Sequence, residues 1–189
     1  KPLPRHFTSD VVFSPDLSLM LDACALPFRD NSIRSLIMVD VFHHIPDVSA
    51  FLHEASRTLK PGGRIIMLEP WNTSWSAWVY AKLHHEPFVP TQKEWAFASK
   101  GPLSDANGAL PWIVFERDSA LFAERYPELS IQQKTLLMPI CYLLSGGVSM
   151  RSLVPGWSYR LIRGLEKALP FHSKLAMFAS LCVEKAPRP

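Results

Sequence analysis

Two short stretches of this sequence combine histidines with acidic residues. His43 and His44 follow closely after Asp40, and His85 and Glu86 lie side by side further along the chain. An imidazole titrates near neutral pH, so it can accept a proton from a substrate or donate one. His43, His44 and His85 are therefore candidate catalytic bases, and the sequence alone does not separate them.

The adjacent pair His43 and His44 also suggests a metal site, because imidazole is a common metal ligand. Neighbouring residues, however, point in different directions on a strand or a helix. We therefore expect one ring to stack near a bound ligand and the other to have a structural role. We predict no metal site.

The elements around these two histidines follow a strand–helix–strand pattern. Ser35–Val41 is an apolar run that suits a strand buried on both faces of a parallel sheet. Asp47 can cap a helix that continues through about Leu59, and the turn Lys60–Gly63 can end it. Arg64–Leu68 is then the next strand. Such a βαβ unit predicts an α/β sheet with a right-handed crossover.

The rest of the chain predicts further elements around one long loop. We expect strands at Phe7–Phe13, Leu129–Met138 and Leu175–Glu184, and helices at Ser74–His84, Glu116–Tyr126 and Trp157–Leu169. The loop 85–111 is rich in proline and glycine. A loop of that length in a compact domain usually covers a site or binds a ligand.

Composition and charge argue against several classes of protein. Hydrophobic residues make up 48% and charged residues 20%, as in an ordinary folded domain. The net charge of +3 comes without a run of lysine and arginine, so we predict no nucleic-acid partner. The longest apolar run, Thr135–Leu144, is too short for a transmembrane span.

Cysteine usage and the start of the chain indicate a compartment. Cys24, Cys141 and Cys182 lie far apart and match no metal or redox spacing. We therefore expect free thiols in a reducing environment. Because the first residues contain no apolar signal segment, we predict a cytoplasmic protein.

Three blocks of the sequence, in order, resemble one known family. Leu21–Ile33 is LDACALPFRDNSI, Val39–Asp47 is VDVFHHIPD, and Glu54–Arg64 is EASRTLKPGGR. Together they resemble the signature of class I S-adenosylmethionine-dependent methyltransferases, and most closely the methyltransferase type 11 group. The resemblance covers roughly residues 7–70, and its strength lies in the order and spacing of the three blocks.

The resemblance implies an α/β fold of the Rossmann-like, doubly wound type. Its sheet would be mostly parallel with an antiparallel last strand. The family's first strand and glycine-rich cofactor loop would lie upstream of Lys1. We infer that about 40–60 upstream residues carry them, so that residues 1–189 alone would bind the cofactor poorly. Residues 1–189 would form a single domain with substrate-side or lid insertions at 71–128 and 145–172.

The cofactor that the resemblance implies is S-adenosylmethionine. The matching positions are Asp10, Asp22, Ala23, Asp40, Val41 and Phe42. By this resemblance, Asp10 would accept hydrogen bonds from the ribose hydroxyls and Asp22 one from the adenine amino group, while the Ala23 N–H would donate to the ring. The segment Asp40–Phe42 would line the methionine and sulfonium end. The simpler alternatives are a turn aspartate at Asp10 and a cap at Asp22.

The function implied is methyl transfer to a small-molecule or lipid-linked acceptor, which chiefly requires alignment and desolvation of that acceptor. His85, Glu86, Asp105 and Asn107 could orient it at a pocket rim, or they could form a hydrated surface loop. A non-catalytic methyltransferase-like subunit is the alternative function, and a homodimer is compatible with either. The blocks around Leu26–Phe28 and Lys60–Gly63 disfavour a nucleotide-binding oxidoreductase.

The predicted helix Trp157–Leu169 is amphipathic, with basic residues on one side and leucines on another. The basic residues are Arg160, Arg163 and Lys167, and the leucines are Leu161, Leu165 and Leu169. One interpretation is peripheral contact with a membrane or a lipid-linked acceptor. The other is a helix that covers the sheet with its apolar side.

Overall fold

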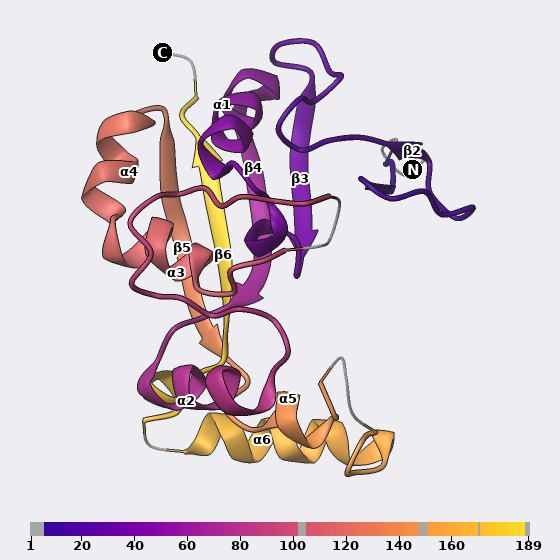
Figure 1. Ribbon diagram of the computed structural model, residues 1–189, viewed down its shortest axis with the longest axis vertical. Coiled ribbons are helices and arrows are strands. Elements are labelled where there is room, and N and C mark those ends of the chain that lie inside the picture. Colours follow the sequence, from indigo (N-terminus) through magenta and orange to yellow (C-terminus); the bar gives the residue numbers. More distant parts are fainter. Residues whose placement is uncertain (1–5, 102–104, 148–150, 170, 188–189) are drawn as a thin grey trace.

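The computed structural model describes residues 6–101, 105–147, 151–169 and 171–187, and it forms an α/β fold (Figure 1). The strands are β1 (Ser9–Asp10), β2 (Leu19–Met20), β3 (Ile33–Val39), β4 (Leu59–Pro70), β5 (Leu129–Leu137) and β6 (Phe178–Lys185). The α-helices are α1 (Val48–Thr58), α2 (Ser74–Leu83), α3 (Leu110–Trp112), α4 (Ser119–Arg125), α5 (Cys141–Leu144) and α6 (Tyr159–Ala168). Short 3₁₀ turns lie at Phe42–His44, Gly156–Ser158 and His172–Leu175.

The main sheet has four strands in the order β3-β4-β6-β5. β3 and β4 pair in parallel, whereas β6 is antiparallel to both β4 and β5. Three strands therefore run in one direction and the last strand of the chain runs against them. The predicted antiparallel last strand is confirmed, but the sheet is mixed rather than mostly parallel, because β6 lies between two strands that run the other way.

One face of this sheet packs against α1, α3 and α4. Their side chains share a core cluster with the inward residues of β4 and β6, and the rings of Phe42 and Phe115 lie 5.2 Å apart within it. The opposite face of β3 is open, with Ile37 exposed by 73% and Val39 by 57%. The prediction of a strand buried on both faces is therefore wrong for β3. Nor do the described residues wrap helices around both faces of β3 and β4, as a doubly wound sheet would require.

The N-terminal segment forms a separate two-stranded parallel sheet of β1 and β2, in which Asp10 pairs with Met20. The strand predicted at Phe7–Phe13 is confirmed only over Ser9–Asp10. The residues after it, including Phe13, are exposed and bend away. β1 and β2 lie to one side of β3 in Figure 1, and no pairing joins them to the main sheet among the described residues.

Local sequence signals place α1 and the entry to β4. The Asp47 side chain accepts a hydrogen bond of 2.9 Å from the Ala50 N–H, as the predicted cap requires. β4 begins at Leu59, and its pairing with β3 shifts register before Arg64. Gly62 takes a φ of +74°, which is a left-handed backbone conformation that suits glycine. The predicted glycine turn is therefore part of an irregular start of β4.

Replacing Gly63 with alanine is expected to destabilise this turn. The added Cβ would lie 2.7 Å from the Lys60 carbonyl oxygen and 3.1 Å from the Arg34 carbonyl oxygen, and both are backbone atoms. Overpacking of this kind costs about 1–3 kcal/mol of unfolding free energy, measurable by urea denaturation. Gly164 is the control, because an alanine Cβ there meets nothing within 4 Å, and Gly164→Ala should stabilise α6 by about 0.5–1 kcal/mol. Equal stabilities of Gly63→Ala and the unchanged protein would contradict the crowding.

The second half of the chain departs from the predicted elements in three places. The helix expected at Glu116–Tyr126 is the end of a longer run, in which α3 continues through a π-helical turn, Ile113–Arg117, into α4. The apolar stretch after β5 folds into α5, which was not predicted. The last strand begins at Phe178 rather than Leu175, because His172–Leu175 forms a 3₁₀ turn. The long loop before α3 is irregular, as predicted, over its described residues.

Within the described ranges, every helix is too short or too polar to cross a lipid bilayer.

Candidate functional site

The site is built around Glu69, a buried carboxylate near the end of β4. Its Oε1 accepts hydrogen bonds of 2.9 Å from the backbone N–H groups of Val41 and Phe42. Its Oε2 lies 2.8 Å from Nδ1 of His43. β3 ends at Val39, so Glu69 fixes the segment that follows this neighbouring strand. Parallel strands end at the same edge of a sheet, and ligands of open α/β sheets bind beyond that edge.

His43 lies between two carboxylates. It is only 2% exposed, and while its Nδ1 faces Glu69, its Nε2 lies 3.4 Å from Oε2 of Glu86. Burial lowers the pKa of His43, but the contacts with Glu69 and Glu86 outweigh it and raise the pKa to about 9. His43 is therefore an imidazolium at neutral pH. A charged ring has no free lone pair that could accept a proton, so at neutral pH the surroundings of His43 suit an electrostatic and positioning role better than that of a general base.

Glu86 connects His43 to three other histidines. His44, His84 and His85 each have a ring nitrogen within 3.7–3.9 Å of a Glu86 carboxylate oxygen. The hydrogen bond with His43 lowers the pKa of Glu86 to about 2, so it is ionised at neutral pH. Glu86 is thus the common partner of the two histidine pairs that the sequence places far apart.

The histidines around Glu86 differ in charge. Burial lowers the pKa of His44, and the charge on His43 lowers it further. Burial also lowers the pKa of His84. Nδ1 of His44 is buried and has no hydrogen-bond partner among the described residues. His85 lies at the margin of the cluster and is 61% exposed. Neutral imidazoles are therefore present at His44 and His84.

Asp40 lies immediately after β3 with a left-handed φ of +53°. Its backbone N–H donates to the Leu68 carbonyl oxygen at 3.0 Å, which ties it to the end of β4. Burial raises the pKa of Asp40 to about 6, and the nearby charge of Glu69 contributes in the same direction. Asp40, Val41 and Phe42 thus form a continuous segment at the same edge as Glu69.

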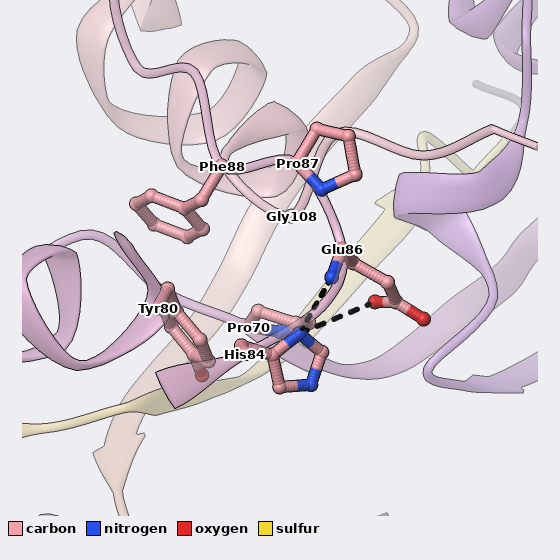
Figure 2. A pocket seen from close by; sticks show the side chains of 7 residues that line it. All are labelled: Pro70, Tyr80, His84, Glu86, Pro87, Phe88 and Gly108. Carbon is pink, nitrogen blue, oxygen red and sulfur yellow. Dashed lines mark hydrogen bonds and ion pairs between the residues drawn. The ribbon is translucent and has the colours of Figure 1, made fainter. Parts of the chain in front are cut away.

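A small pocket adjoins Glu86 (Figure 2). Its lining residues are Pro70, Tyr80, His84, Glu86, Pro87, Phe88 and Gly108. Nδ1 of His84 accepts a hydrogen bond of 3.3 Å from the Glu86 N–H, and its Nε2 lies 3.2 Å from the Tyr142 hydroxyl. The pocket is therefore mostly apolar, with an imidazole and a carboxylate on one wall.

Two groups of side chains have the donor atoms of a metal site. They are His43, His44 and Glu86, and Asp40, His43 and Glu69, with donor atoms within 4.8 Å of one another in each group. His43 belongs to both. A metal would have to displace the proton of a histidine whose pKa is about 9, and Glu69 already accepts two backbone N–H groups. The geometry therefore favours a charged hydrogen-bond network over a metal site.

The segment with Asp22 and Ala23 packs against α1. Ala23 and Cys24 lie on the core cluster that contains Phe42, and the Cys24 thiol donates to the Asp47 carbonyl oxygen at 3.5 Å. The Asp22 carboxylate is exposed and accepts a hydrogen bond of 2.8 Å from the Cys24 N–H. This contact is the local cap that was the simpler alternative for Asp22.

Arg57 holds the rest of this segment in place. Its guanidinium donates to the carbonyl oxygens of Leu26 and Phe28 at 3.0 and 2.8 Å. It also pairs with Asp30 and Glu54 at 2.8 and 2.7 Å. The third sequence block is thereby joined to the first by three hydrogen bonds from one side chain.

Asp10 ends β1, and Asp22 follows the neighbouring strand β2. The Leu21 N–H donates to the Asp10 carbonyl oxygen at 3.1 Å, which brings the two segments together. The Asp10 carboxylate is exposed and accepts from the Val12 N–H, as the turn alternative predicts. Among the described residues, no hydrogen bond or ion pair joins either aspartate to Asp40 or His43.

The structure also corrects the predicted pocket rim. Asn107 is buried, and its amide bonds to both the N–H and the carbonyl of Val89 and to the Gln92 side chain. It organises the loop rather than facing a ligand. Asp105 accepts from the Lys100 N–H, and residues 102–104 of the predicted rim lie outside the described residues.

The sequence did not lead us to select Glu69 or His84 as a site residue. A carboxylate that ends a buried strand is a signal that could have identified Glu69, because such a group must be satisfied inside the fold. No comparable signal marked His84, whose role depends on where the loop after α2 folds.

The comparisons with known proteins concern mainly the N-terminal third of the chain. Residues 8–67 match the methyltransferase domain family Methyltransf_11. A demethylmenaquinone methyltransferase of Tropheryma whipplei is 41% identical over 44 residues, which is 23% of this chain and 18% of that protein. The uncharacterised protein YafE of Escherichia coli is 47% identical over 45 residues, 24% of this chain and 22% of that protein. The matches thus span about a fifth of the length of these relatives.

A solved S-adenosylmethionine-dependent methyltransferase from Methanosarcina mazei is similar to 93% of this chain and 74% of that chain, at 16% identity and a TM-score of 0.49. The family match covers the three sequence blocks, which lie between β2 and β3, directly after β3, and from α1 into β4. The similarity to the methyltransferase domain family therefore rests on residues 8–67, about a third of the chain.

Proposed function

We propose that this protein transfers the methyl group of S-adenosylmethionine to a small-molecule or lipid-linked acceptor. The main support is that Arg57 of the third sequence block holds the first block, while Glu69 fixes Val41 and Phe42 of the second. Three segments that are separate in sequence are therefore held by specific hydrogen bonds, through Arg57 near the start of β4 and through Glu69 near its end. A Rossmann-like arrangement is part of this proposal.

The aspartates of the N-terminal segments have the hydrogen-bond acceptors that a nucleoside needs. Ribose hydroxyls and an adenine amino group are hydrogen-bond donors, and Asp10 and Asp22 are exposed carboxylates that can accept from them. Each uses its Oδ1 to fix its own turn, so its direction is set before a ligand binds. In the proposal, Asp10 binds the ribose, Asp22 the adenine amino group, and the Ala23 N–H the ring.

The segment Asp40–Phe42 would hold the methionine and sulfonium end. The bound cofactor supplies an electrophilic methyl group for in-line attack. Asp40 is ionised above pH about 6, and its carboxylate is suited to the amino group or the sulfonium charge of the cofactor. Val41 and Phe42 keep their N–H groups on Glu69, so their backbone is held in one conformation.

The acceptor would bind on the Glu86 side, between the two stretches proposed as substrate-side segments, 71–128 and 145–172. The apolar wall formed by Tyr80 and Phe88 excludes water, and Glu86 orients polar groups of the acceptor. Where the acceptor must lose a proton, His44 is the proposed base, because its ring is neutral and its Nδ1 has no partner among the described residues. His85 is a second candidate at the exposed margin.

Calorimetry of the full-length protein with S-adenosylhomocysteine tests the proposal. We expect micromolar binding that falls by about tenfold or more in Asp22→Ala, since a charge-assisted hydrogen bond contributes about 1.5–3 kcal/mol. Asp16→Ala is the matched control, because Asp16 is an exposed aspartate between β1 and β2 and should bind normally.

A methyl-transfer assay with radiolabelled cofactor then separates enzyme from binding subunit. Binding without transfer to any of a panel of phenolic, amine and carbon acids would favour the non-catalytic alternative. Absence of binding by the full-length protein would refute the proposal.

A further inference from the structure

Helix α6 presents an apolar and basic surface to the outside of the molecule. Its inward side carries Ser158 and Glu166, which are both buried. Trp157, Leu161 and Leu165 lie on the outward side, with exposures of 79, 63 and 62%. The interpretation that α6 covers the sheet with its leucines is therefore wrong, because these leucines face outward. Trp157, in the 3₁₀ turn just before α6, and Leu161 and Leu165 of α6 follow one another at intervals of four residues and form one row.

The orientation of α6 is fixed by its buried glutamate. Oε1 of Glu166 accepts from the backbone N–H groups of Ile140, at 2.8 Å, and Cys141 at the start of α5. Its Oε2 accepts from Arg163 at 2.8 Å. Turning the helix to bury its leucines would break the two bonds to Ile140 and Cys141 and expose the charged Arg163–Glu166 pair. The outward apolar row is thus a stable feature of the fold.

Basic residues accompany this row. Arg160 and Lys167 are exposed beside the leucines. Arg160 lies about one helical turn before Gly164, and Lys167 about one turn after it. Residues 151–175 contain five basic residues and one acidic residue, the buried Glu166, which gives a net charge of +4 against +3 for the whole chain. The positive charge of the protein is therefore concentrated around α6.

We infer that this surface binds to the face of a lipid bilayer that contains anionic lipids. A helix with large exposed apolar side chains next to a basic row lies in the bilayer interface, with the apolar row among the acyl chains and the basic row at the headgroups. A second copy of the chain fits less well, because it would bring two surfaces of charge +4 together. The inference is independent of the proposed methyl transfer.

The position of α6 gives the contact a consequence for the site. α6 lies at the end of the molecule, with α5 and α2 between it and the main sheet (Figure 1). α5, which Glu166 holds against α6, carries Tyr142, whose hydroxyl lies 3.2 Å from His84 of the pocket. A bilayer bound to α6 would therefore lie at the same end of the molecule as the pocket.

Co-sedimentation of the full-length protein with vesicles tests the inference without cofactor or acceptor. We expect binding to phosphatidylcholine vesicles with about one quarter phosphatidylglycerol, and much weaker binding to phosphatidylcholine alone. Leu161→Ala with Leu165→Ala should weaken binding by about tenfold or more, through lost apolar burial. Arg160→Gln with Lys167→Gln should weaken it about tenfold to thirtyfold and reduce its dependence on salt.

Matched controls come from the opposite side of the molecule. Phe13→Ala with Met20→Ala removes exposed apolar side chains near β2, and Arg34→Gln with Lys60→Gln removes exposed charges at the start of β3 and β4. Both double variants should bind like the unchanged protein. Equal binding to neutral and anionic vesicles, or equal loss in the controls, would overturn the inference. So would light scattering that shows a dimer lost in the leucine variant together with no vesicle binding.

Discussion

Glu69→Ala is expected to cost about 3–5 kcal/mol of unfolding free energy, because it removes one partner of a buried ion pair. The change leaves the imidazolium of His43 facing a cavity at 2% exposure, and it leaves the N–H groups of Val41 and Phe42 without their acceptor. Each such unsatisfied group adds to the cost. Urea denaturation monitored by circular dichroism measures the loss, and cofactor binding should fall with it.

A second glutamate on the same sheet gives the matched control. Glu184 of β6 pairs with Arg64 at 2.7 Å, but Arg64 is largely exposed. Exposed pairs contribute about 0–1 kcal/mol, so Glu184→Ala should have a small effect. Glu69→Gln keeps the shape of the side chain and an acceptor for the two N–H groups. Its loss of unfolding free energy should therefore lie between the losses in Glu69→Ala and Glu184→Ala. Similar losses in Glu69→Ala and Glu184→Ala would mean that Glu69 is not the centre of the site.

The elements nearest to the site could be predicted from sequence because their signals are local. The cap at Asp47, the apolar stripe of α1 and the glycine turn all lie within a few residues of the atoms that they affect. β5 and α2 were also close to their predicted ranges, since each has a continuous apolar or aromatic pattern bounded by turn residues.

The chemistry of the site could not be predicted in the same way, because it depends on contacts between distant segments. Two adjacent histidines gave no sign that one would be charged and the other neutral. That difference arises only when Glu69 from β4 and Glu86 from a loop approach His43. The exposed leucines of α6 are a similar case. The residue pattern shows that the helix has an apolar and a basic side, but the orientation of the helix depends on the contact of Glu166 with the start of α5.

The charge on His43 predicts that the protein loses stability as the pH rises above neutral. The folded-state pKa of His43 is about 9, above the ordinary value of 6.5, so the folded state holds this proton more tightly than the unfolded state. The stabilising contribution is complete below pH 6.5 and is lost as the pH rises through 9. The difference between the two pKa values corresponds to about 3 kcal/mol.

Comparison with a variant isolates this effect from other groups that titrate at alkaline pH. The fall in unfolding free energy between pH 6.5 and pH 10 should be about 3 kcal/mol larger in the unchanged protein than in His43→Gln, since only the former carries the ion pair. His53 is an exposed histidine on α1, so His53→Gln should show the same fall as the unchanged protein. Titration of the imidazole by NMR gives an independent value. If the ring of His43 loses its proton near pH 6.5, Glu69 and Glu86 do not hold it as an imidazolium, and His43 returns as a candidate base.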